Sequence, residues 1–166
     1  MPHRQSGQYR GSARHRRRPV AQVILIDVNL LLYGTIASRP EHSVARGWLE
    51  SCLNGAAAVG LSWSCLLGFV RLASSRKAFP QPLPFDVAWR EVERWLDLPN
   101  VWIPGPMERH REILAPLIEK CATRPDLISD AHLAALAIEH GLILCSTDGD
   151  FARFPGLRWE NPLRPS

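Results

Sequence analysis

The feature of this sequence that most constrains its fold is a short apolar run that ends in two polar residues. In the stretch VILIDVNLLLYG, residues 23–34, an apolar run leads to Asp27, and apolar residues resume after Asn29. A short β-branched run is typical of a strand that is buried on both faces of a parallel sheet. A carboxylate and an amide at the end of such a strand are costly to bury without partners. We therefore expect Asp27 and Asn29 to serve a site at the sheet edge.

Further short apolar runs alternate along the chain with stretches of helical spacing. We predict a strand at 23–27 and four more at 57–62, 100–105, 142–147 and 157–162, the last at a sheet edge. We predict helices at 29–34, 41–53, 63–75, 85–98, 108–121 and 129–141. Asp86 and Ser129 are the expected N-caps of two of them, and Gly141 the expected end of the last. Strands separated by helices predict an α/β fold, a three-layer α/β/α sandwich around a mainly parallel sheet.

Length and composition indicate one domain without a membrane segment. The chain has 166 residues, of which 46% are hydrophobic, and no apolar run approaches the roughly 20 residues that span a bilayer. No apolar signal-peptide core follows the basic N-terminus, which favours a cytoplasmic protein. The four cysteines show no C-x-x-C spacing, so we expect free thiols.

The positive charge of the chain is concentrated at its N-terminus. Six of the 20 basic residues are arginines within the first 19 residues, a segment without acidic residues, so the remainder carries 14 basic against 16 acidic residues. We expect residues 1–21 to be a basic, disordered extension and residues 22–166 to form the folded domain. The extension is either an arm that binds RNA or an addition without a role.

Four aspartates stand at informative positions. Asp27 ends the first predicted strand, Asp148 follows the strand at 142–147, Asp150 comes two residues later, and Asp130 opens the helix at 129–141. If the two strands are neighbours, these carboxylates gather at one edge of the sheet, where they repel one another unless a cation joins them. Hard oxygen ligands without a His or Cys cluster suit Mg²⁺ or Mn²⁺. The pattern therefore predicts a metal site for phosphoryl chemistry.

Other acid-dependent α/β families fit the sequence poorly. A phosphatase of the haloacid-dehalogenase type needs a second Asp where this chain has Asn29. A receiver domain needs a Lys at a late strand end, and the only lysines are Lys77 and Lys120. The chain has no G-x-x-x-x-G-K-[ST] motif, which excludes P-loop chemistry.

Between about residues 23 and 163 the chain resembles a PIN-domain ribonuclease, specifically a VapC-type toxin of a type II toxin–antitoxin system. The resemblance rests on the segments LIDVNLLLYG, LISDAHLAALAIEHG and STDGDFARFPGLRWENP, together with the LLGFVRL helix. It implies a four- or five-stranded parallel sheet and a Mg²⁺-dependent endoribonuclease that cleaves RNA with a metal-activated water. It further implies a VapB-type antitoxin as partner, and we expect a homodimer.

The resemblance also assigns roles to individual residues. Asp27, Asp130 and Asp148 correspond to the catalytic, metal-binding acids, with Asn29, Thr147 and Asp150 as accessory residues of the cofactor site. The family usually carries a Glu in its third helix, where this chain has Gly68. That departure leaves open a second function, a degenerate scaffold that binds an antitoxin without cutting RNA. Arg71, three residues further on, is a candidate contact for phosphate or for a helix–helix salt bridge.

Overall fold

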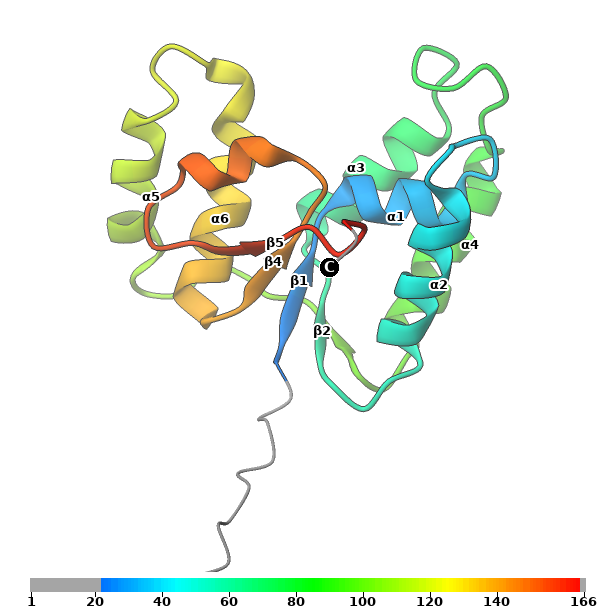
Figure 1. The fold of residues 1–166 in the computed structure, drawn as a ribbon, viewed down its shortest axis with the longest axis horizontal. Coiled ribbons are helices and arrows are strands. Elements are labelled where there is room, and N and C mark those ends of the chain that lie inside the picture. The colour runs from blue at the N-terminus through cyan, green and yellow to red at the C-terminus, as the bar shows by residue number, and fades with distance from the viewer. Residues whose placement is uncertain (1–21, 165–166) are drawn as a thin grey trace, which may run out of the picture.

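A computed structural model describes residues 22–164 and contains a five-stranded sheet in which every pairing is parallel (Figure 1). Its spatial order is β3-β2-β1-β4-β5. The strands are β1 (Ile24–Ile26), β2 (Val59–Gly60), β3 (Val101–Trp102), β4 (Ile143–Cys145) and β5 (Arg158–Glu160). The predicted α/β fold is therefore confirmed, and β5 lies at an edge as expected.

Helices cover both faces of the sheet and complete the predicted three layers. Figure 1 shows α1 to α4 on one side of the sheet and α5 and α6 on the other. The helices are α1 (Val28–Thr35), α2 (His42–Leu53), α3 (Trp63–Ala73), α4 (Phe85–Leu96), α5 (His110–Glu119) and α6 (Ile128–His140). Two 3₁₀ turns, η1 (Pro125–Leu127) and η2 (Gly149–Arg153), precede α6 and follow β4.

The central strands β1 and β4 are buried between the layers. Leu25, Ile26 and Leu144 are fully buried, as expected for parallel strands that helices cover on both faces. Ile24 pairs with Ile143 and Ile26 with Cys145, so the residues that follow the two strands leave the sheet side by side. In the sheet, β1 has β2 and then β3 on one side, and β4 and then β5 on the other, so the strand order reverses between β1 and β4. This reversal of strand order marks the place where parallel sheets usually bind ligands.

The two predicted N-caps, Asp86 and Ser129, are wrong. Helix α4 begins at Phe85 after Pro84, and Asp86 lies in its first turn, paired with Arg90 at 2.6 Å rather than capping the helix. Helix α6 begins at Ile128, one residue before the predicted cap Ser129, because η1 runs directly into it. The predicted end of α6 is confirmed: Gly141 adopts a left-handed conformation with φ of 67°, which glycine accommodates without strain.

Three further expectations concern the cysteines, membrane segments and the N-terminal extension. The four cysteines are free, and Cys65, Cys121 and Cys145 are buried. Within residues 22–164, no helix is both long and apolar enough to cross a membrane. The predicted basic extension, residues 1–21, lies outside the described residues.

Candidate active site

Asp27 is held rigidly at the carboxyl end of β1. Its backbone amide donates to the carbonyl of Cys145 at 3.0 Å, which extends the β1–β4 pairing by one residue. Its side chain caps α1, with Oδ1 accepting from the Val28 amide at 2.7 Å. Asp27 is 6% exposed, and this burial raises the pKa of its carboxyl above the ordinary value of 3.8, as does the nearby charge of Asp148. Hydrogen bonds to the carboxylate act in the opposite direction.

The hydroxyl of Ser146 connects the polar groups that follow β1 and β4. It donates to Asp27 Oδ2 at 2.7 Å, and it accepts from Asn29 Nδ2 at 2.9 Å and from the Asp148 amide at 3.0 Å. Ser146 is fully buried, so these three partners satisfy its hydroxyl away from solvent. This residue was absent from the sequence prediction.

Asn29 and Thr147 lie next to this network but contribute unequally. Asn29, in the first turn of α1, uses its amide nitrogen toward Ser146, while its Oδ1 lies 3.5 Å from the backbone nitrogen of Thr147. The hydroxyl of Thr147 makes no hydrogen bond within residues 22–164. The sequence prediction selected Thr147 as the relevant hydroxyl, whereas Ser146 makes the contacts.

Asp130 and Asp148 reach the same edge from two other elements. Asp148 caps η2, accepts from the Asp150 amide at 2.8 Å and is otherwise exposed. Asp130 lies in the first turn of α6 and is half-buried. Burial, followed by the charges of Asp27 and Asp148, raises the pKa of Asp130 to about 6. The predicted carboxylates therefore act electrostatically on one another.

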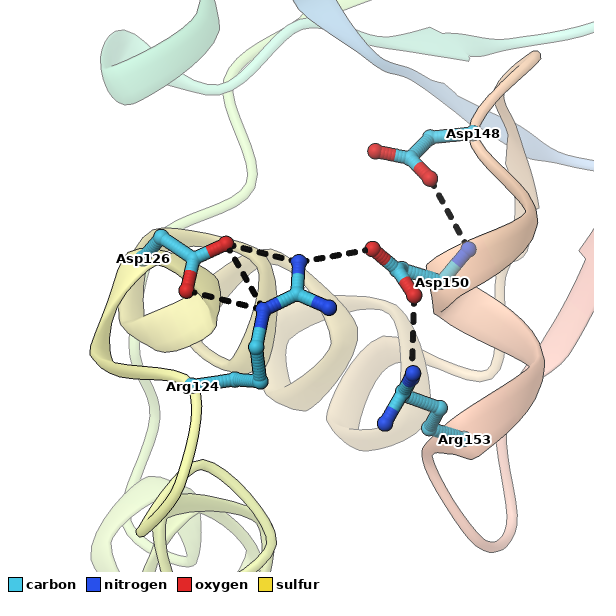
Figure 2. A network of polar contacts seen from close by, with 5 residues as sticks. All are labelled: Arg124, Asp126, Asp148, Asp150 and Arg153. Carbon is cyan, nitrogen blue, oxygen red and sulfur yellow. Dashed lines mark hydrogen bonds and ion pairs between the residues drawn. The ribbon is translucent and has the colours of Figure 1, made fainter.

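Asp150 faces two arginines. Figure 2 shows Arg124 between Asp126 and Asp150, with Arg153 on the other side of Asp150. Arg124 Nη2 lies 3.2 Å from Asp150 Oδ2, and Arg153 Nε lies 2.9 Å from Asp150 Oδ1. Both carboxylate oxygens of Asp150 thus have cationic partners, unlike those of Asp148.

Position 68 faces the start of α1. A side chain on Gly68 would place its Cβ 3.5 Å from Val28 Cγ2, an ordinary packing distance. Val28 directly follows Asp27, so a longer side chain at position 68 would begin beside the acidic edge.

The residues of this edge suit a hard divalent cation. Within residues 22–164, no three His, Cys, Asp or Glu side chains already form a group that could hold a metal ion. Mg²⁺ does not require one, because it keeps several waters and uses one or two carboxylates. The available donors are oxygen atoms. Burial first, and then the charges of neighbouring aspartates, raise the pKa values of Asp27 and Asp130, and a bound cation would offset both effects by favouring the ionised carboxylates.

Comparison with known proteins places this chain in a family. The PIN domain family model matches residues 24–157. Ribonuclease VapC37 of Mycobacterium tuberculosis is 43% identical over 138 residues, which cover 83% of this chain and 96% of the relative. Ribonuclease VapC33 of the same species is 40% identical over 142 residues, covering 86% and 99%. The chain belongs to the VapC ribonucleases of the PIN-domain family.

Solved structures share the fold of this VapC-family chain at low sequence identity. VapBC-1 from nontypeable Haemophilus influenzae has a TM-score of 0.60 at 17% identity, covering 86% of this chain and 100% of that one. FitAcB from Neisseria gonorrhoeae has a TM-score of 0.57 at 24% identity, covering 84% and 97%. These likenesses support the fold, and the predicted resemblance to the family is confirmed by the closer relatives.

Proposed function

We propose that this VapC-family chain is the toxin of a type II toxin–antitoxin system and acts as a Mg²⁺-dependent endoribonuclease, with residues 22–166 as the nuclease domain. The observation that carries the proposal is the buried Asp27, fixed by Ser146 beside Asp148 at the switch point of the sheet. Similarity to proteins named as VapC ribonucleases over most of both chains supports RNA as the substrate.

In this proposal Asp27, Asp130 and Asp148 hold the cation, directly or through water, and Mn²⁺ can replace Mg²⁺. When bound, the ion supplies Lewis-acid activation of the phosphate and lowers the pKa of a water. Asn29 and Ser146 fix the carboxylate of Asp27, while Thr147 lies at the rim of the site. Arg71 is exposed in the last turn of α3, forms no ion pair within residues 22–164, and is a candidate phosphate contact.

The partner that we propose is a VapB-type antitoxin that presents an amphipathic helix. Apolar side chains are exposed on the second and third helices, with Val44 61%, Trp63 46% and Leu67 56% exposed. A groove on this side of the sheet is lined by charged side chains of α2 and α4, among them Arg46, Glu50 and Glu91, which suit the polar face of such a helix. Such surfaces suit the helix-in-groove mode of recognition. Co-purification with the peptide encoded upstream tests this partner.

We also propose that the chain forms a homodimer. A hollow lined by Met107, Ile113 and Ile138 joins α5 and α6 to the segment before α5, on the opposite side of the sheet from the groove described above. Met107 is 49% exposed there. An apolar surface on this side leaves room for self-association while an antitoxin occupies the other. Light scattering on the purified chain measures the assembly directly.

A specific observation favours the second candidate function, a scaffold that binds an antitoxin without cutting RNA. Gly68 supplies no carboxylate at the position beside Val28, where the family usually has Glu. Against it stand the three aspartates, all present at the carboxyl edge of the sheet. RNA cleavage by the purified chain distinguishes the two functions.

The deciding experiment compares the wild type with Asp148→Asn. We expect the substitution to reduce Mg²⁺-dependent RNA cleavage by about 10²- to 10³-fold, the usual effect of removing one electrostatic contributor to a transition state. Folding should be preserved, because the Asp148 side chain is exposed. Asp97→Asn is the matched control. This exposed aspartate follows α4 and precedes β3, so it lies at the amino end of that strand, whereas the candidate site lies at the carboxyl ends of β1 and β4. Equal cleavage by Asp148→Asn and the wild type would refute the site.

A further inference from the structure

Two separate chain segments carry the less rigid acids of the candidate site. Asp130 follows η1 in the segment 124–130, and Asp148 lies in the segment 147–153 that contains η2. Among the hydrogen bonds and ion pairs of residues 22–164, only the contact between Arg124 and Asp150 joins these two segments. Figure 2 shows this contact spanning the space between them.

Arg124 is oriented before it reaches Asp150. Its Nε lies 3.0 Å from Asp126 Oδ1, and its Nη2 lies 2.7 Å from Asp126 Oδ2, a forked pairing within one segment. An arginine held in this way has already lost much of its side-chain entropy, so the added contact with Asp150 costs little further ordering. The Arg124 side chain is 41% exposed. An isolated ion pair at such an exposed site contributes little, and the prior ordering of Arg124 by Asp126 is what distinguishes this pair.

Asp150 is equally constrained on its own segment. Its Oδ1 accepts from Arg153, three residues later in η2, and its backbone amide donates to Asp148 Oδ1. A displacement of Asp150 would therefore be transmitted to the carboxylate of Asp148 through a 2.8 Å hydrogen bond.

We propose that the Arg124–Asp150 ion pair sets the separation between Asp130 and Asp148, and that both of its members are positioning residues. This inference rests on the proposed function, because the separation matters for a cation that the two acids share. It gives Asp150 a different task from the accessory metal-site role that the sequence suggested: its carboxylate oxygens bind two arginines, and its backbone amide donates to the carboxylate of Asp148.

Electrostatics and positioning predict opposite effects for one substitution. Arg124→Ala removes a positive charge beside a cation site, so a purely electrostatic role predicts tighter binding of a divalent cation. Loss of positioning predicts weaker binding. Arg153→Ala is the matched control. It also removes a positively charged partner of the Asp150 carboxylate, but the contact that it breaks lies entirely within η2.

The first test is calorimetric titration of the metal-free full chain with Mn²⁺. We expect Arg124→Ala and Asp150→Ala each to weaken binding about fivefold, the effect of losing one well-formed surface pair. The double variant should be no weaker than either single variant, because both remove the same contact. Arg153→Ala should bind Mn²⁺ at least as tightly as the wild type. Unchanged or tighter binding by Arg124→Ala, or additive losses in the double variant, would overturn the inference.

A second measurement needs no metal and separates this inference from the proposed function. In the metal-free chain, Asp150→Ala should accelerate amide hydrogen exchange in residues 124–132, because its one hydrogen-bonded or ion-paired contact with that segment, among residues 22–164, is to Arg124. Arg153→Ala should leave exchange in that segment unchanged. If the wild type neither binds Mn²⁺ nor cleaves RNA, the proposed function fails. If exchange at residues 124–132 does not respond to Asp150→Ala, the positioning role fails.

Discussion

Asp27 and Asp148 follow neighbouring strands, yet the structure holds their side chains in different ways. The carboxylate of Asp27 is buried and accepts hydrogen bonds from the Val28 amide and the Ser146 hydroxyl. The carboxylate of Asp148 is exposed and accepts from the amide of Asp150. The backbone amide of Asp148 donates to the Ser146 hydroxyl, and the same hydroxyl donates to the carboxylate of Asp27.

This difference teaches that the candidate site has one fixed part and one adjustable part. The fixed part extends the sheet itself, because the pairing of β1 with β4 continues through the Asp27 amide. The adjustable part consists of Asp130 and Asp148, whose segments are joined by a partly exposed ion pair. In the proposed site, a cation would meet a carboxylate already fixed in place at Asp27 and would complete the arrangement of Asp130 and Asp148.

The largest expected effect comes from breaking the fixed part with Ser146→Ala. The change removes three hydrogen bonds at a fully buried position and leaves Asp27 Oδ2 without its donor. We expect a loss of about 2–3 kcal/mol in the free energy of unfolding, because an unsatisfied buried acceptor costs about 1–3 kcal/mol and more when charged. Denaturant unfolding at neutral pH measures it.

Thr147→Ala is the control for that experiment, since it removes a neighbouring hydroxyl that makes no hydrogen bond within residues 22–164. Its free energy of unfolding should stay within about 0.5 kcal/mol of the wild type. Equal stabilities for the two variants would show that Ser146 does not organise the edge.

The fold could be predicted from the sequence because each element has a local signal. The apolar run before Asp27 and the helical spacing of residues 129–141 correspond to β1 and α6. The N-caps were predicted less accurately, because Asp86 and Ser129 have side chains typical of caps, whereas Pro84 and Leu127 occupy the cap positions in the structure. A 3₁₀ turn such as η1 leaves no comparable signal in residue type.

The candidate site was only partly predictable for a different reason. The positions of Asp27 and Asp148 follow from strand ends, whereas the choice between Ser146 and Thr147 depends on the register of β1 with β4. Adjacent residues of an extended chain point in opposite directions, so an error of one residue selects the wrong hydroxyl. The contact of Arg124 with Asp150 spans 26 residues and carries no local pattern.

Gly68→Glu tests the contrast between Asp27 and Asp148 by adding a carboxylate beside Asp27, in the fixed part of the site. Its Cβ would pack 3.5 Å from Val28, so the helix can accept the side chain. We expect the concentration of Mg²⁺ at half-maximal cleavage to fall about tenfold, which corresponds to about 1.4 kcal/mol of binding. The wild type should accordingly need high Mg²⁺ or prefer Mn²⁺.

Gly68→Ala controls for the helix, because replacing a mid-helix glycine stabilises by roughly 1 kcal/mol without adding a carboxylate. It should shift the melting temperature upward and leave the Mg²⁺ dependence unchanged. If Gly68→Glu and Gly68→Ala show the same Mg²⁺ dependence, position 68 does not serve the cation.

The smallest expected effect concerns the adjustable part in the absence of metal. The pKa of Asp130 is raised from 3.8 to about 6 by burial and by the charges of its neighbours. The folded chain therefore binds this proton more tightly than the unfolded chain, and stability falls as the pH rises from about 4 to above 6. Asp130→Asn removes that loss, because the amide stays neutral throughout.

We expect Asp130→Asn to stabilise the metal-free chain at pH 7 and to leave it nearly unchanged at pH 4, where the wild-type carboxyl is largely protonated in the folded state. A fully buried group with this pKa would give about 3 kcal/mol, and solvent screening at the half-buried position reduces the gain to about 1 kcal/mol. Unfolding free energies of both proteins at the two pH values, with chelator present, measure the difference. The same comparison with saturating Mn²⁺ should reverse in sign, because the variant lacks a ligand that the bound cation uses. A gain that persists in Mn²⁺ would contradict the assignment of Asp130 to the cation.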